Sequence, residues 1–142
     1  MTRIDFYHGA TDKIQIACRL VNELHQDGRH VLVYAPDETV AAQLDRQLWS
    51  QPATGFLPHC RLESKLASET PVLIGSSATS LTEAPHHDVL INLDGELPPV
   101  FARFDQLVEI VGTSDADRQP ARERFKFYRD RGYALQTHNL SA

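Results

Sequence analysis

The chain has few cysteines and no long hydrophobic run. Its 142 residues include two cysteines, Cys18 and Cys60, which are too few for a disulfide framework. Cys18 falls inside a predicted helix, where we expect a small core residue. No apolar stretch is long enough to span a membrane, and the N-terminal sequence has no apolar signal-peptide core. These absences predict a cytoplasmic protein whose residues 1–142 form a single domain.

The motifs of nucleotide-binding enzymes are also missing. Neither G-x-x-x-x-G-K-[ST] nor G-x-G-x-x-G follows a predicted strand. GSSATS, residues 75–80, has small residues that can approach a phosphate and resembles a short helicase motif, but no companion motif accompanies it. No serine or cysteine nucleophile has a recognisable context, and the carboxylates are scattered. We therefore expect a protein without a catalytic site and without a cofactor.

Two adjacent residue pairs, His59–Cys60 and His86–His87, are weak candidates for metal ligands. Neighbouring side chains on an extended chain point to opposite sides. No C-x-x-C or H-x-x-x-H spacing accompanies either pair. We therefore expect no metal site.

Apolar runs alternate with amphipathic segments along the chain. The run HVLVYA at 30–35 is rich in β-branched and aromatic residues, which is typical of a strand buried on both faces. The alternation predicts an α/β domain with a mostly parallel central sheet flanked by helices, Rossmann-like but without a nucleotide site. Strands are expected at residues 4–7, 30–35, 71–75, 88–93, 106–111 and 133–137.

Capping residues mark two helices in the first half of the chain. The first helix is expected to begin after Thr11 or Asp12 and to be closed by Gly28. The second is expected to open at residues 36–38 and to end near Trp49. From there to residue 71, and from 76 to 87, the composition predicts loops.

A single stretch near the C-terminus reverses the charge of the chain. Between Arg118 and Arg131, six basic and two acidic residues give +4, whereas the other eight basic and seventeen acidic residues give −9. A local field of one sign attracts partners of the other sign. The acidic remainder argues against general binding to duplex DNA.

The basic stretch predicts a helix that ends before Gly132. Ser114 and Asp117 are both candidate N-caps. Pro120 favours Asp117, because proline is tolerated in the first turn of a helix and not deeper.

One stripe of this helix combines an aromatic ring with four cations, because residues three and four apart share a face. Beside the stripe lie Ala121, Arg124 and Tyr128, of which Ala121 and Tyr128 are the expected core contacts. The stripe is either a solvated face or a site for an acidic partner that carries an apolar group. A second possibility for a partner is single-stranded nucleic acid, whose bases stack on aromatic rings. The stripe comprises Arg118, Arg122, Phe125, Lys126 and Arg129.

Large apolar residues occur among turn formers at residues 49–59, WSQPATGFLPH. Trp49, Phe56 and Leu57 are either tucked onto the core or covered by a partner. From the residues alone we favour the core.

The chain resembles the chi subunit of bacterial DNA polymerase III, a component of the clamp-loader assembly. Three blocks carry the resemblance: a short N-terminal strand ending in FY, residues 44–59 (LDRQLWSQPATGFLPH), and residues 119–137 (QPARERFKFYRDRGYALQT). The resemblance covers nearly the whole chain, with residues 61–87 the exception. It implies a non-catalytic α/β protein of DNA replication.

The resemblance also implies two partners. One is the acidic C-terminal tail of single-stranded DNA-binding protein, which ends in an apolar residue with a free carboxylate. The other is the psi subunit of the clamp loader, with a helicase as a competitor for the psi surface. The implied psi contacts are Trp49, Phe56, Leu57 and Pro58. The implied tail contacts are Val111, Arg118, Arg122, Phe125 and Lys126, and Arg129 continues the same stripe.

Two positions depart from the family pattern. Phe125 stands where a tyrosine is common, so a hydroxyl hydrogen bond to the tail is expected to be missing. Arg118 stands where a lysine is familiar, which keeps the charge and changes its geometry. We therefore expect the binding mode to persist with a different affinity.

Overall fold

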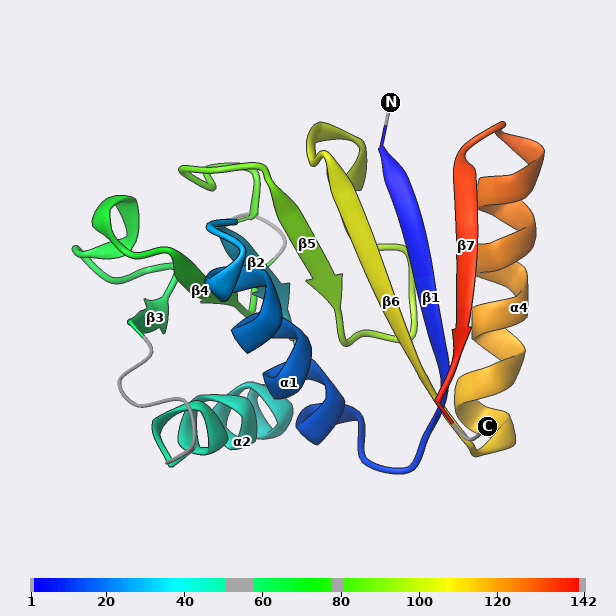
Figure 1. The fold of residues 1–142 in the computed structure, drawn as a ribbon, viewed down its shortest axis with the longest axis horizontal. Coiled ribbons are helices and arrows are strands. Elements are labelled where there is room, and N and C mark those ends of the chain that lie inside the picture. Colours follow the sequence, from blue (N-terminus) through cyan, green and yellow to red (C-terminus); the bar gives the residue numbers. More distant parts are fainter. Residues whose placement is uncertain (1, 51–57, 78–80, 141–142) are drawn as a thin grey trace.

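Seven strands of the described chain form one sheet in which every pairing is parallel. The computed structural model describes residues 2–50, 58–77 and 81–140. The strands lie side by side in the order β3-β4-β2-β5-β6-β1-β7, so that β3 and β7 are the two edges (Figure 1). Their bounds are β1 Arg3–Ala10, β2 Val31–Tyr34, β3 His59–Arg61, β4 Val72–Gly75, β5 Val89–Asn92, β6 Gln106–Gly112 and β7 Ala134–Asn139.

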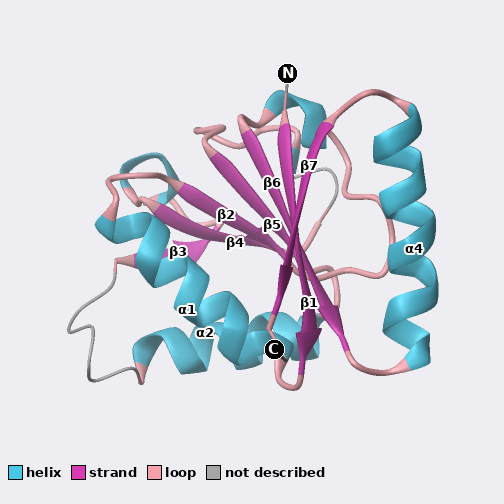
Figure 2. Cartoon of the chain, turned by 45° about the vertical axis from the view of Figure 1, so that its right-hand side comes forward, coloured by secondary structure: helices cyan, strands magenta, loops and turns pink. Residues whose placement is uncertain are grey.

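Helices cover both faces of this sheet. Helices α1 (Lys13–Gln26) and α2 (Glu38–Trp49) pack on one face, and α4 (Asp115–Asp130) packs on the other (Figure 2). In the connections that the structure describes lie the short 3-10 helices η2 (Ala67–Glu69) and η3 (Phe101–Arg103). The α/β class and the parallel sheet expected from the sequence are confirmed. Among the described residues, no helix is both long and apolar enough to cross a membrane.

The central strands supply both halves of the core. All four residues of β2 are buried, and they alternate between the two faces. Val31 and Val33 pack under α1 and α2, whereas Leu32 and Tyr34 belong to the cluster under α4. This alternation explains why the sequence shows a continuous apolar run, because a strand covered on both faces has no solvent side.

The helix starts follow local capping chemistry. The Asp12 side chain accepts a hydrogen bond from the backbone N–H of Gln15, and Asp37 accepts one from Thr39. Gly28 follows α1 with φ +80°, a left-handed conformation that glycine adopts without a steric penalty. Asp12 rather than Thr11 is therefore the cap of the first helix.

The preference for Asp117 as the N-cap of the basic helix is wrong. Ser114 caps α4, and its side chain accepts from the backbone N–H of Asp117. The Asp117 carboxylate instead accepts from the Gly112 N–H at 3.1 Å and pairs with Lys13 at 3.1 Å. Pro120 lies inside the helix, which gives up one backbone hydrogen bond there because proline has no N–H.

The expectation of an unbroken loop from Trp49 to residue 71 is also wrong. His59–Arg61 forms the short edge strand β3, so Cys60 lies in a strand. The strand pairs with β4, and His59 stands opposite Val72. A strand of three residues is too short to show an alternation of apolar and polar residues in the sequence. It forms because its backbone pairs with the neighbouring strand.

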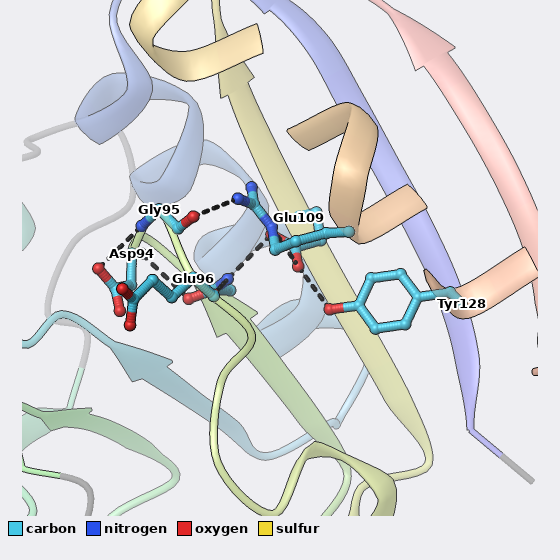
Figure 3. Close-up of polar contacts among 7 residues, drawn as sticks. Asp94, Gly95, Glu96, Glu109 and Tyr128 are labelled. Atoms are coloured by element: carbon cyan, nitrogen blue, oxygen red, sulfur yellow. Dashed lines mark hydrogen bonds and ion pairs between the residues drawn. The ribbon is translucent and has the colours of Figure 1, made fainter. Parts of the chain in front are cut away.

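A buried carboxylate joins α4 to the sheet. Glu109 on β6 is fully buried, and its Oε2 accepts hydrogen bonds from Tyr128 Oη at 2.7 Å and Arg124 Nε at 3.1 Å (Figure 3). Its Oε1 accepts from Asn92 Nδ2 on β5 at 3.0 Å. Arg124 Nη1 also donates to the Gly95 carbonyl at 2.7 Å. The network therefore ties the helix to two strands and to the loop that follows β5.

The electrostatics of this network depend on burial. Desolvation raises the pKa of the Glu109 carboxyl, and the Arg124 charge together with the hydrogen bonds acts in the opposite direction. Burial, followed by the neighbouring Glu109 charge, raises the pKa of Tyr128, so its phenol stays protonated and donates at neutral pH. Tyr128 and Ala121 are buried as expected, whereas the burial of Arg124 was not predicted.

Arg124→Met should lower the free energy of unfolding by about 3–5 kcal/mol, because it leaves a buried carboxylate without its cation. Urea denaturation followed by circular dichroism would measure the loss. Arg129→Met is the matched control: its side chain is 61% exposed, and the expected change is within about 0.5 kcal/mol. Equal losses in the two variants would contradict the structural role of the network.

Candidate functional site

A pocket of about 260 Å³ lies between α4 and the sheet, close to the β7 edge. We call it the α4 pocket. Three strands and one helix build it, because β1, β6 and β7 are neighbours in the sheet and α4 crosses the same face. The strands contribute Phe6, His8, Val111 and Thr137, and the helix contributes Arg118, Ala121, Arg122 and Phe125.

One side of the α4 pocket is apolar. The Phe125 ring meets Phe6 edge-on, with 5.3 Å between ring centroids. Val111 and Ala121 are buried beside them. Phe125 itself is half-buried, so part of its ring is left for a ligand. A hydrophobic side chain could fill this part of the pocket and gain by leaving water.

The other side is cationic. Arg118 and Arg122 line the pocket from successive turns of α4, and both are exposed. Arg118 Nη2 pairs with Asp115 Oδ1 at 2.8 Å, which partly neutralises its charge. Within the described residues, Arg122 has no ion-pair partner. Arg122 is therefore the better placed guanidinium for a carboxylate ligand.

The structure brings together four of the six expected tail-binding residues, namely Val111, Arg118, Arg122 and Phe125. Lys126 and Arg129 are exposed on α4 and do not line the pocket. Arg129 also pairs with Asp130 at 3.4 Å.

Sequence reasoning missed Phe6, His8 and Thr137 as members of this site. Thr137 stands opposite Phe6 in the β1–β7 register, so strands from the beginning and from the end of the sequence lie side by side at the pocket. No spacing along the sequence signals such a contact, because it depends on which strands are neighbours.

A second exposed surface lies beside the β3 edge. Trp49, the last residue of α2, is 57% exposed, so the expectation that it is tucked onto the core is wrong. Its ring lies 4.4 Å from that of His59. The His59 side chain is buried, with Nε2 at 3.0 Å from Asp45 Oδ1. We call the exposed Trp49, together with Pro58, which precedes His59 in the chain, the Trp49 surface. Phe56 and Leu57, which were expected to belong to it, lie outside the described residues.

Sequence comparison identifies the family. The model of the family described as DNA polymerase III chi subunit, HolC, matches residues 1–136. This chain belongs to that family. It is similar to the DNA polymerase III subunit chi of Pseudomonas aeruginosa, with 39% identity over 99% of this chain and 98% of the relative. The subunits of Haemophilus influenzae and Escherichia coli are each 33% identical, over 89% and 87% of this chain and 86% and 82% of their own lengths. The chain is therefore a replication accessory subunit of the chi type, as the resemblance implied.

A larger crevice of this chi-family chain, about 440 Å³, opens at the carboxyl ends of β1 and β6. It adjoins the starts of α1 and α4, where a parallel sheet often binds ligands. Lys13 and Asp117 both line it and pair with each other at 3.1 Å. The Lys13 ammonium at the crevice is thus already paired with the Asp117 carboxylate.

The GSSATS segment, whose small residues could approach a phosphate, is described only in part, because residues 78–80 lie outside the described residues.

The histidine pairs do not converge on a common point. His87 packs edge-on against Phe104, whereas the His86 ring lies 4.9 Å from that of His30. No three His, Cys, Asp or Glu side chains in the part of the chain that the structure describes are grouped so that they could hold a metal ion. Both ring nitrogens of His86 are buried without a hydrogen-bond partner among the described residues. Burial, with the neighbouring His30 charge as the next cause, lowers the pKa of His86 to about 4.

His86 should make the fold less stable in mild acid. Its pKa is about 4 in the folded chain and about 6.5 in the unfolded chain, so only the unfolded chain gains this proton between those values. The stabilisation is complete above about pH 6.5 and is lost as the pH falls toward 4, by less than about 1.4 kcal/mol per pH unit. Urea unfolding at pH 7.5 and 5.0 would measure it. His86→Phe, which keeps a ring without a titrating nitrogen, should show a smaller loss, and an identical loss would rule His86 out as the cause.

Proposed function

We propose that this chi-family chain is a non-catalytic connector that joins the clamp loader, through a psi subunit, to the acidic C-terminal tail of single-stranded DNA-binding protein. The observation that carries the proposal is the α4 pocket, where an apolar wall and two guanidinium groups share one cavity of about 260 Å³. An acidic peptide with an apolar C-terminal residue has the complementary chemistry.

Each part of such a tail has a counterpart in the pocket. The terminal side chain packs against Val111 and Phe125, and the terminal carboxylate, attached to the same carbon atom, lies beside Arg122. A guanidinium can hold a carboxylate through two parallel hydrogen bonds. Acidic residues further up the tail are attracted by Arg118 and Lys126. These exposed pairs contribute on the order of 0–1 kcal/mol each and weaken with salt.

The Trp49 surface is the proposed site for psi. A tryptophan that is 57% exposed offers a large apolar area, and such residues are enriched at the centres of protein interfaces. The buried His59 ring packs against the Trp49 ring, with 4.4 Å between ring centroids. By the family resemblance, a helicase could compete for the same surface.

The positions of the two sites fit a connector. The Trp49 surface adjoins β3 and the α4 pocket adjoins β7, and these strands are the opposite edges of the sheet (Figure 1). Two partners can therefore bind at once without meeting on the same face. The centre of the sheet separates them, because β2, β4 and β5 are buried on both sides.

Direct binding of single-stranded DNA by α4 is the alternative. Bases stack on the faces of exposed aromatic rings. Phe125 is half-buried and packs against Phe6, while the guanidinium of Arg131 lies 4.5 Å from the centre of the Phe127 ring. These contacts occupy ring surface that a base would need, so the geometry favours an acidic peptide over a nucleic acid.

Arg122→Ala should weaken binding of an acidic peptide with a C-terminal phenylalanine by about tenfold or more, roughly 1.4 kcal/mol, because the terminal carboxylate loses its guanidinium. Arg129→Ala is the matched control and should change the dissociation constant less than twofold. Fluorescence anisotropy at low and high salt, with free and amidated peptide, would measure both.

Binding that weakens with salt and on amidation supports the proposal. If the two variants weaken binding equally, the carboxylate site is elsewhere on α4. If no peptide binds at low salt but bare single-stranded DNA does, the alternative replaces the tail-binding role.

Trp49→Ala should abolish association with psi and leave the tail affinity within about twofold, because the two sites adjoin opposite edges of the sheet. Size-exclusion chromatography with psi and peptide anisotropy would measure the two effects. Leu97→Ala, which truncates another exposed apolar residue, is the control and should retain psi. An altered circular dichroism spectrum of Trp49→Ala would instead assign the ring a structural role.

A further inference from the structure

A histidine lies in the wall of the α4 pocket. His8 is on β1, two residues after Phe6, and alternate side chains of a strand point to the same face. Because Phe6 belongs to the cluster under α4, the His8 imidazole lies on the α4 side of the sheet as well. It is half-buried and lines the pocket together with Arg118 and Arg122.

The charged groups around His8 are mainly positive. From α4, Arg118 and Arg122 share its pocket, and Lys126 is exposed further along the same helix. Of the acidic residues on α4, Asp115 is paired with Arg118 and Asp117 with Lys13.

The strands next to β1 offer His8 no available carboxylate. On β6, Val111 lines the pocket, and Glu109 is held by Arg124, Asn92 and Tyr128. On β7, the pocket is lined by the uncharged Thr137.

Asp5 and His138 stand on strand positions of the opposite face and pair with each other at 3.0 Å. Among the described residues, an imidazolium at His8 would therefore share the pocket with two guanidiniums, and no carboxylate lines it.

We propose that His8 is a proton-dependent binding residue of the α4 pocket, whose imidazolium pairs with the terminal carboxylate of the bound tail. This inference rests on the proposed tail-binding function and adds a specificity-determining residue to it. The imidazolium is expected to pair with the terminal carboxylate and not with a side-chain carboxylate. The reason is that the terminal carboxylate is attached to the same carbon atom as the side chain that fills the apolar part of the pocket.

The consequence is that binding takes up a proton. A bound carboxylate beside the His8 imidazole favours its charged form over its neutral form. Histidine side chains ordinarily titrate near pH 6.5, whereas terminal and aspartate carboxyls titrate near 3.3–3.9, so the tail stays ionised over about pH 5.8–8.2. The complex then holds more protons than the separated molecules, and the dissociation constant must fall as the pH falls.

The test is peptide anisotropy at pH 5.8, 7.0 and 8.2 and constant ionic strength, with the free-carboxylate peptide ending in phenylalanine. The wild-type dissociation constant should be about five- to tenfold smaller at pH 5.8 than at pH 8.2. His8→Asn and His8→Leu should bind with little dependence on pH. His8→Lys, charged throughout this range, should bind at pH 8.2 about as tightly as the wild type does at pH 5.8. His25→Gln on α1, on the other face of the sheet, should keep the wild-type dependence.

Calorimetry tests the same proton uptake on the wild-type chain, without any substitution. The binding enthalpy should vary between phosphate and Tris buffers in proportion to the proton taken up at pH 7.0, and the variation should disappear with the amidated peptide. No uptake, or an unchanged pH dependence in both His8→Asn and His8→Leu, would overturn the role of His8 while tail binding stands. Absence of peptide binding at every pH would instead overturn the tail-binding function.

Discussion

The buried carboxylate of Glu109 is the constraint on which the α4 pocket depends. A charged group without water requires donors at fixed positions, and here they come from Arg124 and Tyr128 on α4 and from Asn92 on β5. Apolar packing alone would tolerate small shifts of α4 along the sheet. The hydrogen bonds fix the rotation of α4 about its own axis and its position along the sheet. They thereby determine which of its side chains reach the α4 pocket.

Helix α4 therefore has two functions on opposite sides of its axis. Its inner side carries Ala121, Arg124 and Tyr128 into the core, and its outer side keeps cations in water. Phe125 lies at the boundary between them, packed against Phe6 yet partly accessible. A pocket at this boundary offers both apolar contact and positive charge, which is the combination that an acidic peptide with an apolar end requires.

Much of this arrangement is predictable from local sequence. The β-branched runs predicted the central strands, and the spacing of Arg118, Arg122 and Phe125 predicted that they share one face. Local rules failed where tertiary contacts compete with them. Asp117 has the chemistry of an N-cap, but its carboxylate is engaged by Lys13 and Gly112. The edge strand at 59–61 has no hydrophobic pattern that would predict it. It is defined by its backbone pairing with β4.

The sequence by itself determined the basic and aromatic stripe and the class of the fold, since both follow from the period of apolar and charged residues along one helix or strand. Only the tertiary structure decided which residues complete the pocket. Phe6 and His8 come from the beginning of the chain and Thr137 from its end, and they meet because β1 lies between β6 and β7 in a parallel sheet. Strand order is a property of the whole chain, since it depends on how both faces of the sheet are covered, and no local pattern encodes it.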